Sequence, residues 1–384
     1  MNEVVIVEAV RTPVGKRKGL LSEIRPDELL GRVFREVVDR VNLDAKEIDD
    51  VIAGCVSQVG EQGGDVARIS ALIAGFPIEV PGVTIDRQCG SSLQAVQFAS
   101  QAIACGDMDI VVAGGVESMS RVPMFSNMKG VNYSAKLTDQ FEMINQGLSA
   151  ERIADQAGFP REELDAFAVR SHEKAFSAMK EERFEREILP IETQDRQGLP
   201  LMMKEDEGPR RGTSVETLAD LAPAFEEHGK ITAGNASQIS DGASAVLLMS
   251  RTKAEELGFK ARCRIIARSV VGSDPTLMLT GPVPATQKVL KKAGLQLSDI
   301  DLFEVNEAFA SVPLYWLKET GADAGRLNVN GGAIALGHPL GATGTKLLTT
   351  LVHELERSQS RYGLLAICEG LGMANAMVIE RISG

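Results

Sequence analysis

The sequence predicts an α/β fold made of two similar halves, with a mostly helical region inserted into the first half. Strand-like apolar runs alternate with amphipathic helical patterns, which indicates a largely parallel sheet covered by helices on both faces. A short pattern near residue 43 returns near residue 295, and residues 118–239 carry few strand signals and many polar helical ones. A chain of 384 residues exceeds the usual size of a single core, so two or three structural units are expected.

The first half is predicted to begin with a buried strand and to continue as alternating helices and strands. Apolar residues recur either as short β-branched runs, typical of buried strands, or on one face at helical spacing. The run before Cys89 is predicted to be a short buried strand. In chain order, the segments are a strand at 4–10, a helix at 27–41, a strand within 47–58, a helix at 64–76, a strand at 80–85 and a strand at 109–115.

The chain returns to the sheet after the inserted region. A strand pattern at 245–250 is followed by a helical pattern from Thr252 and by another strand at 262–271. We therefore expect a first half made of residues 1–117 and 240–262, an inserted loop domain at 118–239, and a second half at 263–384.

An internal repeat supports the division into two halves. Leu43, Ile48 and Asp49 align with Leu295, Ile300 and Asp301 at one constant offset. The same offset brings the turn at Cys89 close to the glycine-rich stretch GHPLGATGTKLL, and DIVVAGGVESM close to AICEGLGMANAMVIE. A duplicated α/β unit has a natural place for a site where its two halves meet.

Charge and cysteine content exclude several classes of function. Lys and Arg total 41 against 53 Asp and Glu, a net charge of −12, which argues against a nucleic-acid or anionic-membrane surface. No C-x-x-C pair occurs, so neither a disulfide framework nor a zinc site is indicated. Free thiols, no signal-peptide pattern and no apolar run of about 18 residues favour a cytoplasmic protein. The five cysteines are at positions 55, 89, 105, 263 and 368.

Cys89 is the first candidate nucleophile. It lies between the predicted strand at 80–85 and a helical pattern that begins with the small residues Gly90, Ser91 and Ser92. Unpaired N–H groups and the helix dipole at a helix N-terminus favour a thiolate over a thiol. Two interpretations of this segment stay open, because a buried structural cysteine is also common.

Three further residues are candidates for chemistry at the other half. His338 is flanked by Gly and Pro in a glycine-crowded stretch, whereas His172, His228 and His353 lie in polar helical or loop contexts. A histidine near a cysteine is the arrangement that produces a thiolate nucleophile at neutral pH. Cys368 ends an apolar strand just before Gly370 and Gly372. It is either a core residue or a second thiol that gives and takes a proton.

Asn306 follows a predicted strand together with Glu307. An Asn at a strand exit is usually a turn former. At this place it is also a candidate for orienting a water molecule or an oxyanion.

These residues lie in a series of motifs that resembles the thiolase family. The motifs DRQCGSS, GGVESMSR, TAGNASQISDGA, NEAFA, GGAIALGHPLGATG and CEGLG occur in this order. The resemblance extends from RTPVG near the start to the last strand. It implies the thiolase fold, in which two similar halves form a five-layered α/β/α/β/α core that carries an inserted, mostly helical loop domain.

The resemblance also implies an activity and a role for each residue. Cys89 attacks the 3-keto carbonyl of a 3-ketoacyl-CoA while His338 takes its proton, and Cys368 protonates the departing acetyl-CoA enolate. A second coenzyme A then removes the acyl group from Cys89, and the reverse reaction is a Claisen condensation. His338 with a water held by Asn306 is expected to form one oxyanion site. The N–H groups of Cys89 and Gly370 are expected to form the other.

Two residues are expected to bind coenzyme A, again by resemblance. Ser237 matches a serine that contacts the pantetheine arm, and Arg210 matches a position near the adenine end. For Arg210 a solvated surface role is the alternative. Coenzyme A is expected as a co-substrate, with no tightly bound cofactor and no metal, and the family implies a homodimer or homotetramer.

One stretch departs from the family. Many thiolases specific for acetoacetyl-CoA carry His-Met-Gly where this chain has Asn145, Gln146 and Gly147. Since that motif helps to line the acyl pocket, a longer or bulkier acyl group is expected. The alternatives are a ketoacyl synthase type of condensing enzyme, which lacks a thiol at the place of Cys368, and a non-catalytic acyl-CoA or lipid binder, which need not retain every catalytic residue.

Overall fold

The computed structural model describes residues 2–195 and 197–382, and in it one large mixed sheet runs through both halves of the chain. Its strands follow the order β10-β11-β12-β9-β1-β8-β5-β3-β4, and the short β2 pairs with β8. Their bounds are β1 (Val4–Arg11), β2 (Gly15–Lys16), β3 (Asp50–Gly54), β4 (Gly82–Ile85), β5 (Ile110–Ser118), β8 (Ser240–Ser250), β9 (Cys263–Gly272), β10 (Leu302–Val305), β11 (Tyr362–Glu369) and β12 (Met373–Arg381).

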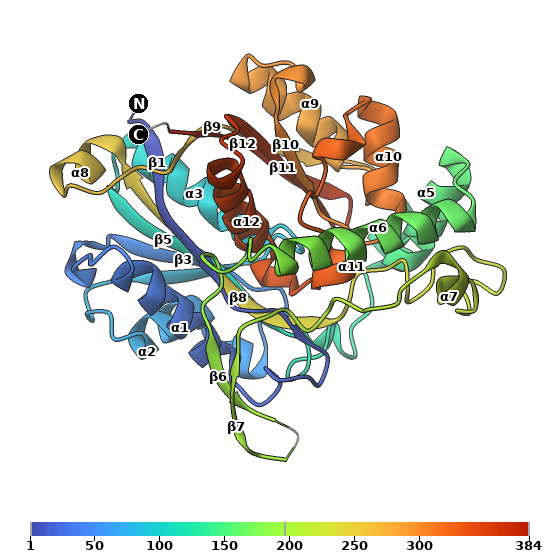
Figure 1. Cartoon of the computed structure of the whole chain (residues 1–384), viewed down its shortest axis with the longest axis horizontal. Coiled ribbons are helices and arrows are strands. Elements are labelled where there is room, and N and C mark those ends of the chain that lie inside the picture. Colours follow the sequence, from blue (N-terminus) through green and yellow to red (C-terminus); the bar gives the residue numbers. More distant parts are fainter. Residues whose placement is uncertain (1, 196, 383–384) are drawn as a thin grey trace.

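The sheet folds over two central helices, α3 (Ser91–Cys105) and α12 (Thr343–Arg357). Among the described residues, a two-residue pairing of β1 with β9 joins its two parts. Figure 1 shows α3 and α12 between these parts. Helices α1 (Pro26–Asp39) and α2 (Val66–Ile73) cover the outer face of the first part, and α9 (Pro282–Ala293) and α10 (Ser311–Thr320) cover that of the second. The five-layered α/β/α/β/α core is therefore confirmed.

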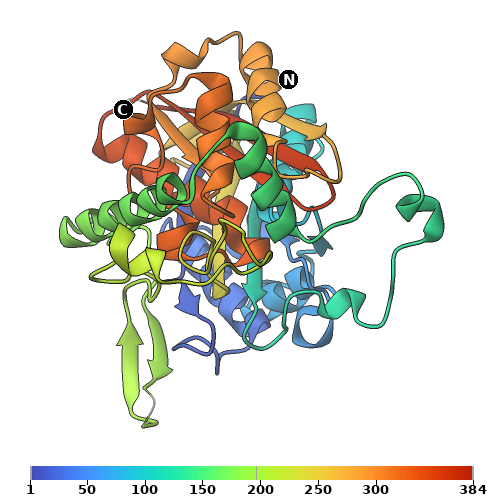
Figure 2. The same ribbon diagram turned by 90° about the vertical axis from the view of Figure 1, so that its right-hand side faces the viewer.

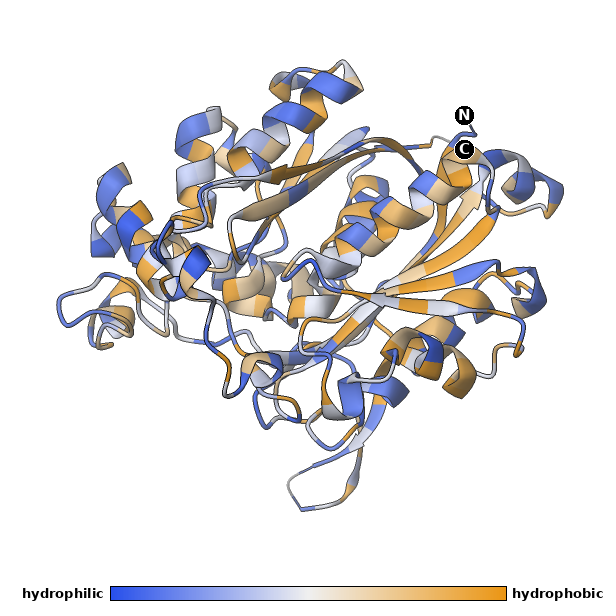
Figure 3. Ribbon diagram, turned by 180° about the vertical axis from the view of Figure 1, so that it is seen from behind, coloured by the Kyte–Doolittle hydropathy of each residue, from blue (hydrophilic) through white to orange (hydrophobic). Residues whose placement is uncertain are grey.

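Apolar side chains fill the spaces between the layers. One cluster joins α1 and α2 to the first part of the sheet, a second joins α9 and α10 to the second part, and a third surrounds α3 and α12. Figure 3 shows strands that are mostly apolar and outer helices with polar outward faces. Burial of this apolar area is the dominant stabilising contribution to such a fold.

The two halves repeat at an offset of 252 residues. Helix α3 begins at residue 91 and α12 at residue 343, and β5 begins at residue 110 and β11 at residue 362. Asp49 accepts hydrogen bonds from two successive backbone N–H groups at the start of β5. Asp301 does the same at the start of β11. The short match between residues 43–49 and 295–301 therefore marks a repeated structural unit.

Two predictions about the sheet are wrong. Only the pairings β3–β4, β3–β5 and β10–β11 are parallel among the described residues, and the other pairings of the large sheet are antiparallel. A tight turn at 370–372 joins β11 directly to β12, so no helix reverses the chain there. The strand predicted at 80–85 is β4, a half-buried edge strand rather than a buried one.

The inserted region is helical with one unpredicted strand pair. It contains α4 (Ala135–Thr138), α5 (Gln146–Ala157), α6 (Arg161–Lys180) and α7 (Val215–Ala219). The hairpin of β6 (Ile191–Gln194) and β7 (Pro200–Met203) projects from the body, as does the segment between β5 and α5 (Figure 2). Two short helices, α8 (Arg251–Glu256) and α11 (Ala333–Leu336), complete the fold. In the described part of the chain, no helix combines the length and apolarity needed to span a bilayer.

Candidate active site

The N-terminal ends of the two central helices lie against each other. A side chain at Gly344 would collide with the backbone N of Leu93, and the N–H of Thr345 donates a hydrogen bond of 3.0 Å to Ser92 Oγ. Glycine permits this close approach of two backbones. The approach brings the turn that carries Cys89 next to the loop that carries His338.

Cys89 lies two residues before the first residue of α3 and is 5% exposed. Burial raises the pKa of its thiol well above the ordinary value, and the neighbouring Cys368 and Glu369 raise it further. The prediction that the helix N-terminus favours a resting thiolate is therefore wrong, because desolvation outweighs the dipole at this buried place. The thiol is neutral at rest.

His338 is held in a defined tautomer. Its Nδ1 lies 2.7 Å from Thr343 Oγ1, and that hydroxyl donates to the carbonyl of Pro339 at 2.8 Å. Since the single hydroxyl proton is used there, the network assigns the imidazole proton to Nδ1 and leaves the lone pair on Nε2. Burial lowers the pKa of His338 to about 3, with a further contribution from Lys346. The ring is a neutral base at rest.

The backbone before His338 depends on a glycine. Gly337 has φ of +96°, and a side chain there would collide with Ser240 Oγ. The same hydroxyl accepts a hydrogen bond of 3.1 Å from the N–H of His338. A left-handed glycine and a serine from the start of β8 thus fix the direction in which the imidazole points.

Asn306 links the histidine to the second thiol. It follows β10, and its Nδ2 lies 3.4 Å from His338 Nε2. It also donates toward the thiol of Cys368, which lowers the pKa of that group. Its buried Oδ1 has no hydrogen-bond partner among the described residues. A buried amide oxygen without a partner is a place for a donor that arrives with water or substrate.

Cys368 is a buried thiol at the end of β11. Burial raises its pKa to about 12, and Glu369 raises it further. The structure therefore brings Cys89, His338, Asn306 and Cys368 together from both halves of the chain. Two neutral thiols, one neutral base and one amide form a site in which a proton can be moved without a permanent charge.

Gly370 is bordered by two amide side chains. The position that a Cβ would take at residue 370 lies 3.1 Å from Gln88 Oε1 and 3.2 Å from Gln146 Nε2. Asn145 is not directed to this place, because its side chain caps α5 by accepting from the N–H of Gly147 at 2.8 Å. The departure from His-Met-Gly therefore leaves a glutamine beside Gly370.

The two residues expected to bind coenzyme A, Ser237 and Arg210, lie on two segments that are hydrogen-bonded to each other. Ser237 is half-buried, and its N–H donates to the carbonyl of Ala308, two residues beyond Asn306, at 2.9 Å. Gln238 Nε2 donates to the carbonyl of Gly208 at 2.9 Å, which holds the Arg210 loop against this segment. Arg210 is exposed, and its guanidinium makes no ion pair within residues 2–195 and 197–382.

Sequence reasoning missed the carboxylates that hold the site in place. Glu117 accepts from four donors, one of which is the N–H of Gly341 at 2.9 Å. Glu307 accepts from Ser171, from Asn328 and from the N–H of Ile334. Thr343, which orients His338, was also missed. All three residues lie inside the motifs GGVESM, NEAFA and GHPLGATG, so their position in the motifs was an available signal.

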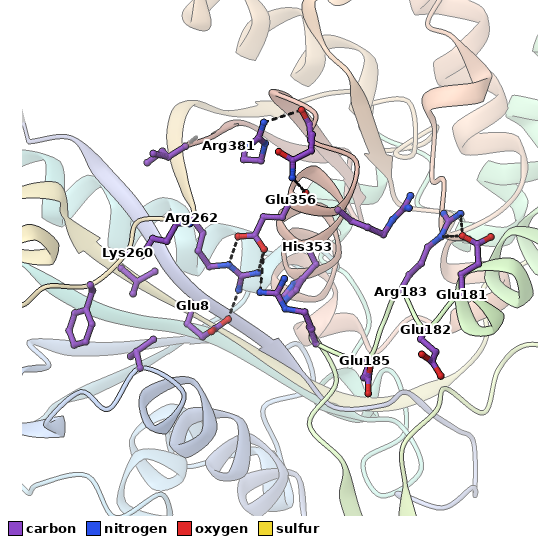
Figure 4. Close-up of a pocket in the computed structure, with 17 residues that line it drawn as sticks. Glu8, Glu181, Glu182, Arg183, Glu185, Lys260, Arg262, His353, Glu356 and Arg381 are labelled. Carbon is purple, nitrogen blue, oxygen red and sulfur yellow. Dashed lines mark hydrogen bonds and ion pairs between the residues drawn. The ribbon is translucent and has the colours of Figure 1, made fainter. Parts of the chain in front are cut away.

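A cavity of about 830 Å³ lies at the other end of α12, away from these residues (Figure 4). Its charged side chains largely satisfy one another. Arg262 pairs with Glu8 and, at 2.8 Å, with Glu356, and Arg183 pairs with Glu181 at 2.8 Å. Neither candidate thiol and none of the residues His338, Asn306 and Gly370 lines this cavity.

Comparisons with known proteins identify the family of the chain. The family model described as the N-terminal domain of thiolase matches residues 4–252, and the model of the C-terminal domain matches residues 259–381. The chain is 48% identical to a steroid 3-ketoacyl-CoA thiolase of Mycobacterium tuberculosis over 100% of this chain and 95% of that protein. It is 46% identical to an acetyl-CoA acetyltransferase of Pseudomonas aeruginosa over 99% and 100%. The crystal structure of the acetyl-CoA acetyltransferase of Bacillus anthracis superposes with a TM-score of 0.92, at 39% identity, over 100% and 99% of the two chains.

Proposed function

Because this chain belongs to the thiolase family, we propose that it cleaves a 3-ketoacyl-CoA with coenzyme A and runs the reverse condensation through the same site. Acetyl-CoA and a shortened acyl-CoA are the products of cleavage. The observation that carries the assignment of roles is the meeting of two buried thiols, Cys89 and Cys368, with a neutral His338 whose Nε2 is unprotonated.

The first half-reaction forms an acyl-enzyme. His338 Nε2 takes the proton of the Cys89 thiol, and Sγ attacks the 3-keto carbonyl carbon. The bond between C2 and C3 of the substrate then breaks, and its electron pair passes to the leaving acetyl-CoA enolate. Cys368 donates its proton to C2 of the enolate and becomes a thiolate. Acetyl-CoA departs, and the acyl group stays on Cys89 as a thioester.

The second half-reaction restores the resting enzyme. The Cys368 thiolate takes the proton of the incoming coenzyme A thiol, and the coenzyme A sulfur attacks the thioester carbonyl. Cys89 leaves as a thiolate and recovers its proton from the His338 imidazolium. Each group returns to the neutral state that burial favours at rest.

Each half-reaction places negative charge on a carbonyl oxygen, so two oxyanion sites are required. We assign one to His338 with a water held by Asn306, supported by the unpartnered Oδ1 of Asn306. The other is assigned to the N–H groups of Cys89 and Gly370. Fixed donors in a buried site stabilise such a charge without reorganising during the reaction.

We assign the coenzyme A site to the rim formed by Ser237 and Arg210. The tie between Gln238 and Gly208 holds the two segments next to each other. The exposed Arg210 supplies a positive charge in a chain with net charge −12. This is the local charge that an anionic co-substrate requires in an acidic protein.

The acyl group is proposed to be longer or bulkier than acetoacetyl. Gln146 occupies the place beside Gly370, and Asn145 is used as a helix cap. Turnover on acetoacetyl-CoA, 3-ketohexanoyl-CoA and longer 3-ketoacyl-CoA substrates measures this directly. We expect kcat/KM to rise with chain length. A strong preference for acetoacetyl-CoA would contradict the proposal.

The decisive experiment follows the acyl-enzyme. Wild-type protein incubated with a 3-ketoacyl-CoA is expected to gain the mass of one acyl group, and Cys89→Ala is expected to gain none. The matched control is Cys105→Ala, because Cys105 is exposed and far from the site. Absence of an adduct from the wild type, or its presence on Cys89→Ala, would contradict the assignment of the nucleophile.

Three proposals about organisation accompany the function. We divide the chain into residues 1–117 with 240–262, an inserted loop domain at 118–239, and residues 263–384. The enzyme is proposed to be a cytoplasmic homodimer or homotetramer. The edge strand β4 supports association, because within residues 2–195 and 197–382 it pairs with β3 alone and Val83 on it is exposed. Sedimentation equilibrium measures the number of subunits.

A further inference from the structure

Glu369 is a buried carboxyl group that the proposed reaction does not use. It directly follows Cys368 on β11, its side chain is 0% exposed, and neither of its oxygens has a hydrogen-bond partner among the described residues. A side chain at Gly90 would collide with Glu369 Oε1. The carboxyl group therefore packs directly against the turn that carries Cys89, in space that only a glycine leaves free.

The polar groups around Glu369 lack a donor. Asn375 Nδ2 donates to the carbonyl of Gly90 at 2.9 Å, while Asn375 Oδ1 is buried without a partner. An ionised Glu369 would add two more acceptors to this place. One proton on Glu369 supplies the missing donor and removes a buried charge. The inventory of donors and acceptors thus favours the neutral acid.

The equivalent carboxyl group of the first half has the hydrogen-bond donors that Glu369 lacks. Glu117 lies 252 residues before Glu369, and it accepts from two backbone N–H groups of the 56–57 turn, from Gln62 and from the N–H of Gly341. Glu369 lies against Gly90 at the start of the other central helix without any such donor. The two positions share a backbone frame and differ in their hydrogen bonding.

The charged groups around Glu369 shift its pKa in opposite directions. Burial raises its pKa to about 9, Arg87 lowers it and Asp86 raises it. Glu369 in turn raises the pKa of Cys89 and of Cys368, and Glu117 acts on Cys89 in the same direction. Lys346 lowers the pKa of His338 from the other side of the site. An anion at Glu369 would therefore oppose ionisation of both thiols.

We propose that Glu369 is held as a neutral acid and is a positioning residue, whose hydroxyl completes the hydrogen bonding beneath the Cys89–Gly90 turn and whose ionisation at alkaline pH opposes formation of the Cys89 thiolate. This inference rests on the proposed function only in taking Cys89 as the nucleophile. The protonation state of Glu369 is independent of which substrate the enzyme accepts.

The first experiment compares the wild type with Glu369→Gln, which keeps a donor and an acceptor but never ionises. Iodoacetamide modification of the Cys89 peptide is followed by mass spectrometry from pH 7 to pH 10.5. The exposed Cys105 serves as an internal reference for reagent reactivity. Near pH 7 we expect Cys89 to be modified at equal rates in both proteins. At pH 10 we expect the rate in Glu369→Gln to exceed the wild-type rate by about threefold or more, which corresponds to a difference of about half a unit in the pKa of Cys89. A constant ratio across this range would overturn the proposal.

The second experiment detects the proton itself. The infrared difference spectrum between wild type and Glu369→Gln at pH 7 is expected to contain the carbonyl-stretch band of a protonated carboxyl group. Glu304, whose buried carboxyl has a pKa raised to about 8, contributes equally to both proteins and cancels. If the variant does not fold, the wild-type band is titrated, and a component that loses intensity near pH 9 is expected in addition to the Glu304 component, which is expected to lose intensity near pH 8. Absence of the band at pH 7 would overturn the proposal, whereas a wild type without an acyl adduct would contradict only the proposed function.

Discussion

The two central helices begin at equivalent positions of the two halves, but the turns before them differ in chemistry. Before α3 the chain presents Cys89 and Gly90, and before α12 it presents His338 and Gly341. Asp49 and Asp301 anchor the strands β5 and β11 in the same way in both halves. The backbone anchors are thus repeated, while Cys89, the proposed nucleophile, lies in one half, and His338, the proposed base, and Cys368 lie in the other. Two halves with similar structure thus supply the different side chains that one site requires.

The largest expected effect tests whether Cys89 and Cys368 have separate roles, one as nucleophile and the other as acid and base. Cys368→Ala is expected to be acylated still at Cys89 by acetyl-CoA, because coenzyme A can leave as a thiolate without the proton that Cys368 supplies in the wild type, whereas removal of the acetyl α-proton requires the base at Cys368. Exchange of the acetyl α-protons with solvent is expected to fall by about 10²–10⁴-fold, the usual contribution of a positioned acid–base group. Deuterium exchange into acetyl-CoA, followed by mass spectrometry, measures it. Normal exchange in this variant would refute the role of Cys368.

Substitution of the two equivalent carboxyl groups, Glu117 and Glu369, is expected to change the free energy of unfolding by different amounts. Glu117→Gln replaces an acceptor of four hydrogen bonds by an amide whose NH₂ faces backbone donors, and we expect a loss of roughly 2–4 kcal/mol in the free energy of unfolding. Glu369→Gln has no such donors to lose. Urea denaturation of both variants at pH 7 makes the comparison. Equal losses would show that the difference in hydrogen bonding has no energetic consequence.

The stability of the wild type and that of Glu369→Gln are expected to depend differently on pH. The pKa of Glu369 rises from its ordinary 4.5 to about 9 on folding, so between these values the folded protein holds a proton that the unfolded chain has lost. The unfolded state then binds fewer protons, and the stability of the wild type falls as pH rises through this window, by at most about 1.4 kcal/mol per pH unit for this group. The advantage of Glu369→Gln over the wild type is expected to grow from pH 5 to pH 9.

Much of the fold and of the site was predictable from the sequence because the informative residues have no alternative at their positions. Gly337 and Gly344 permit backbone approaches that any side chain would block, and their spacing around His338 was visible as a motif. The alternation of helices and strands indicated the layers. The motifs in their order then indicated the five-layered core.

The parts that were not predictable depend on partners distant in the chain. The antiparallel direction of β12 results from the tight turn after Cys368, and periodicity carries no information about strand direction. The pKa of Cys89 depends on desolvation and on Cys368 and Glu369, which lie about 280 residues away in the chain. The use of Asn145 as a helix cap was likewise invisible until its bond to Gly147 was seen.

Replacing Thr343, which orients the His338 imidazole, is expected to lower kcat by an intermediate amount. Thr343→Val removes the hydroxyl that accepts from His338 Nδ1 and keeps a similar shape, so the imidazole can rotate and its tautomer is no longer fixed. We expect kcat to fall by about 10²-fold, as for other small misplacements of a catalytic group, with KM little changed. Thr343→Ser, which keeps the hydroxyl, is the matched control and is expected to retain activity within a few-fold. Equal losses in both variants would attribute the effect to packing.

The smallest expected effect tests whether Asp49 and Asp301, the repeated anchors of β5 and β11, contribute equally to the free energy of unfolding. Asp49 Oδ2 accepts from two N–H groups at 2.7 and 2.9 Å, and Asp301 Oδ2 accepts from two at 2.8 and 2.9 Å. Because geometry and donors match, Asp49→Ala and Asp301→Ala are each expected to lower the free energy of unfolding by about 1–2 kcal/mol, since hydrogen bonds to a charged acceptor contribute somewhat more than neutral ones. A difference between the variants of more than about 1 kcal/mol would mean that equal geometry at the two anchors does not imply equal energy, and that the halves have diverged in stability as well as in chemistry.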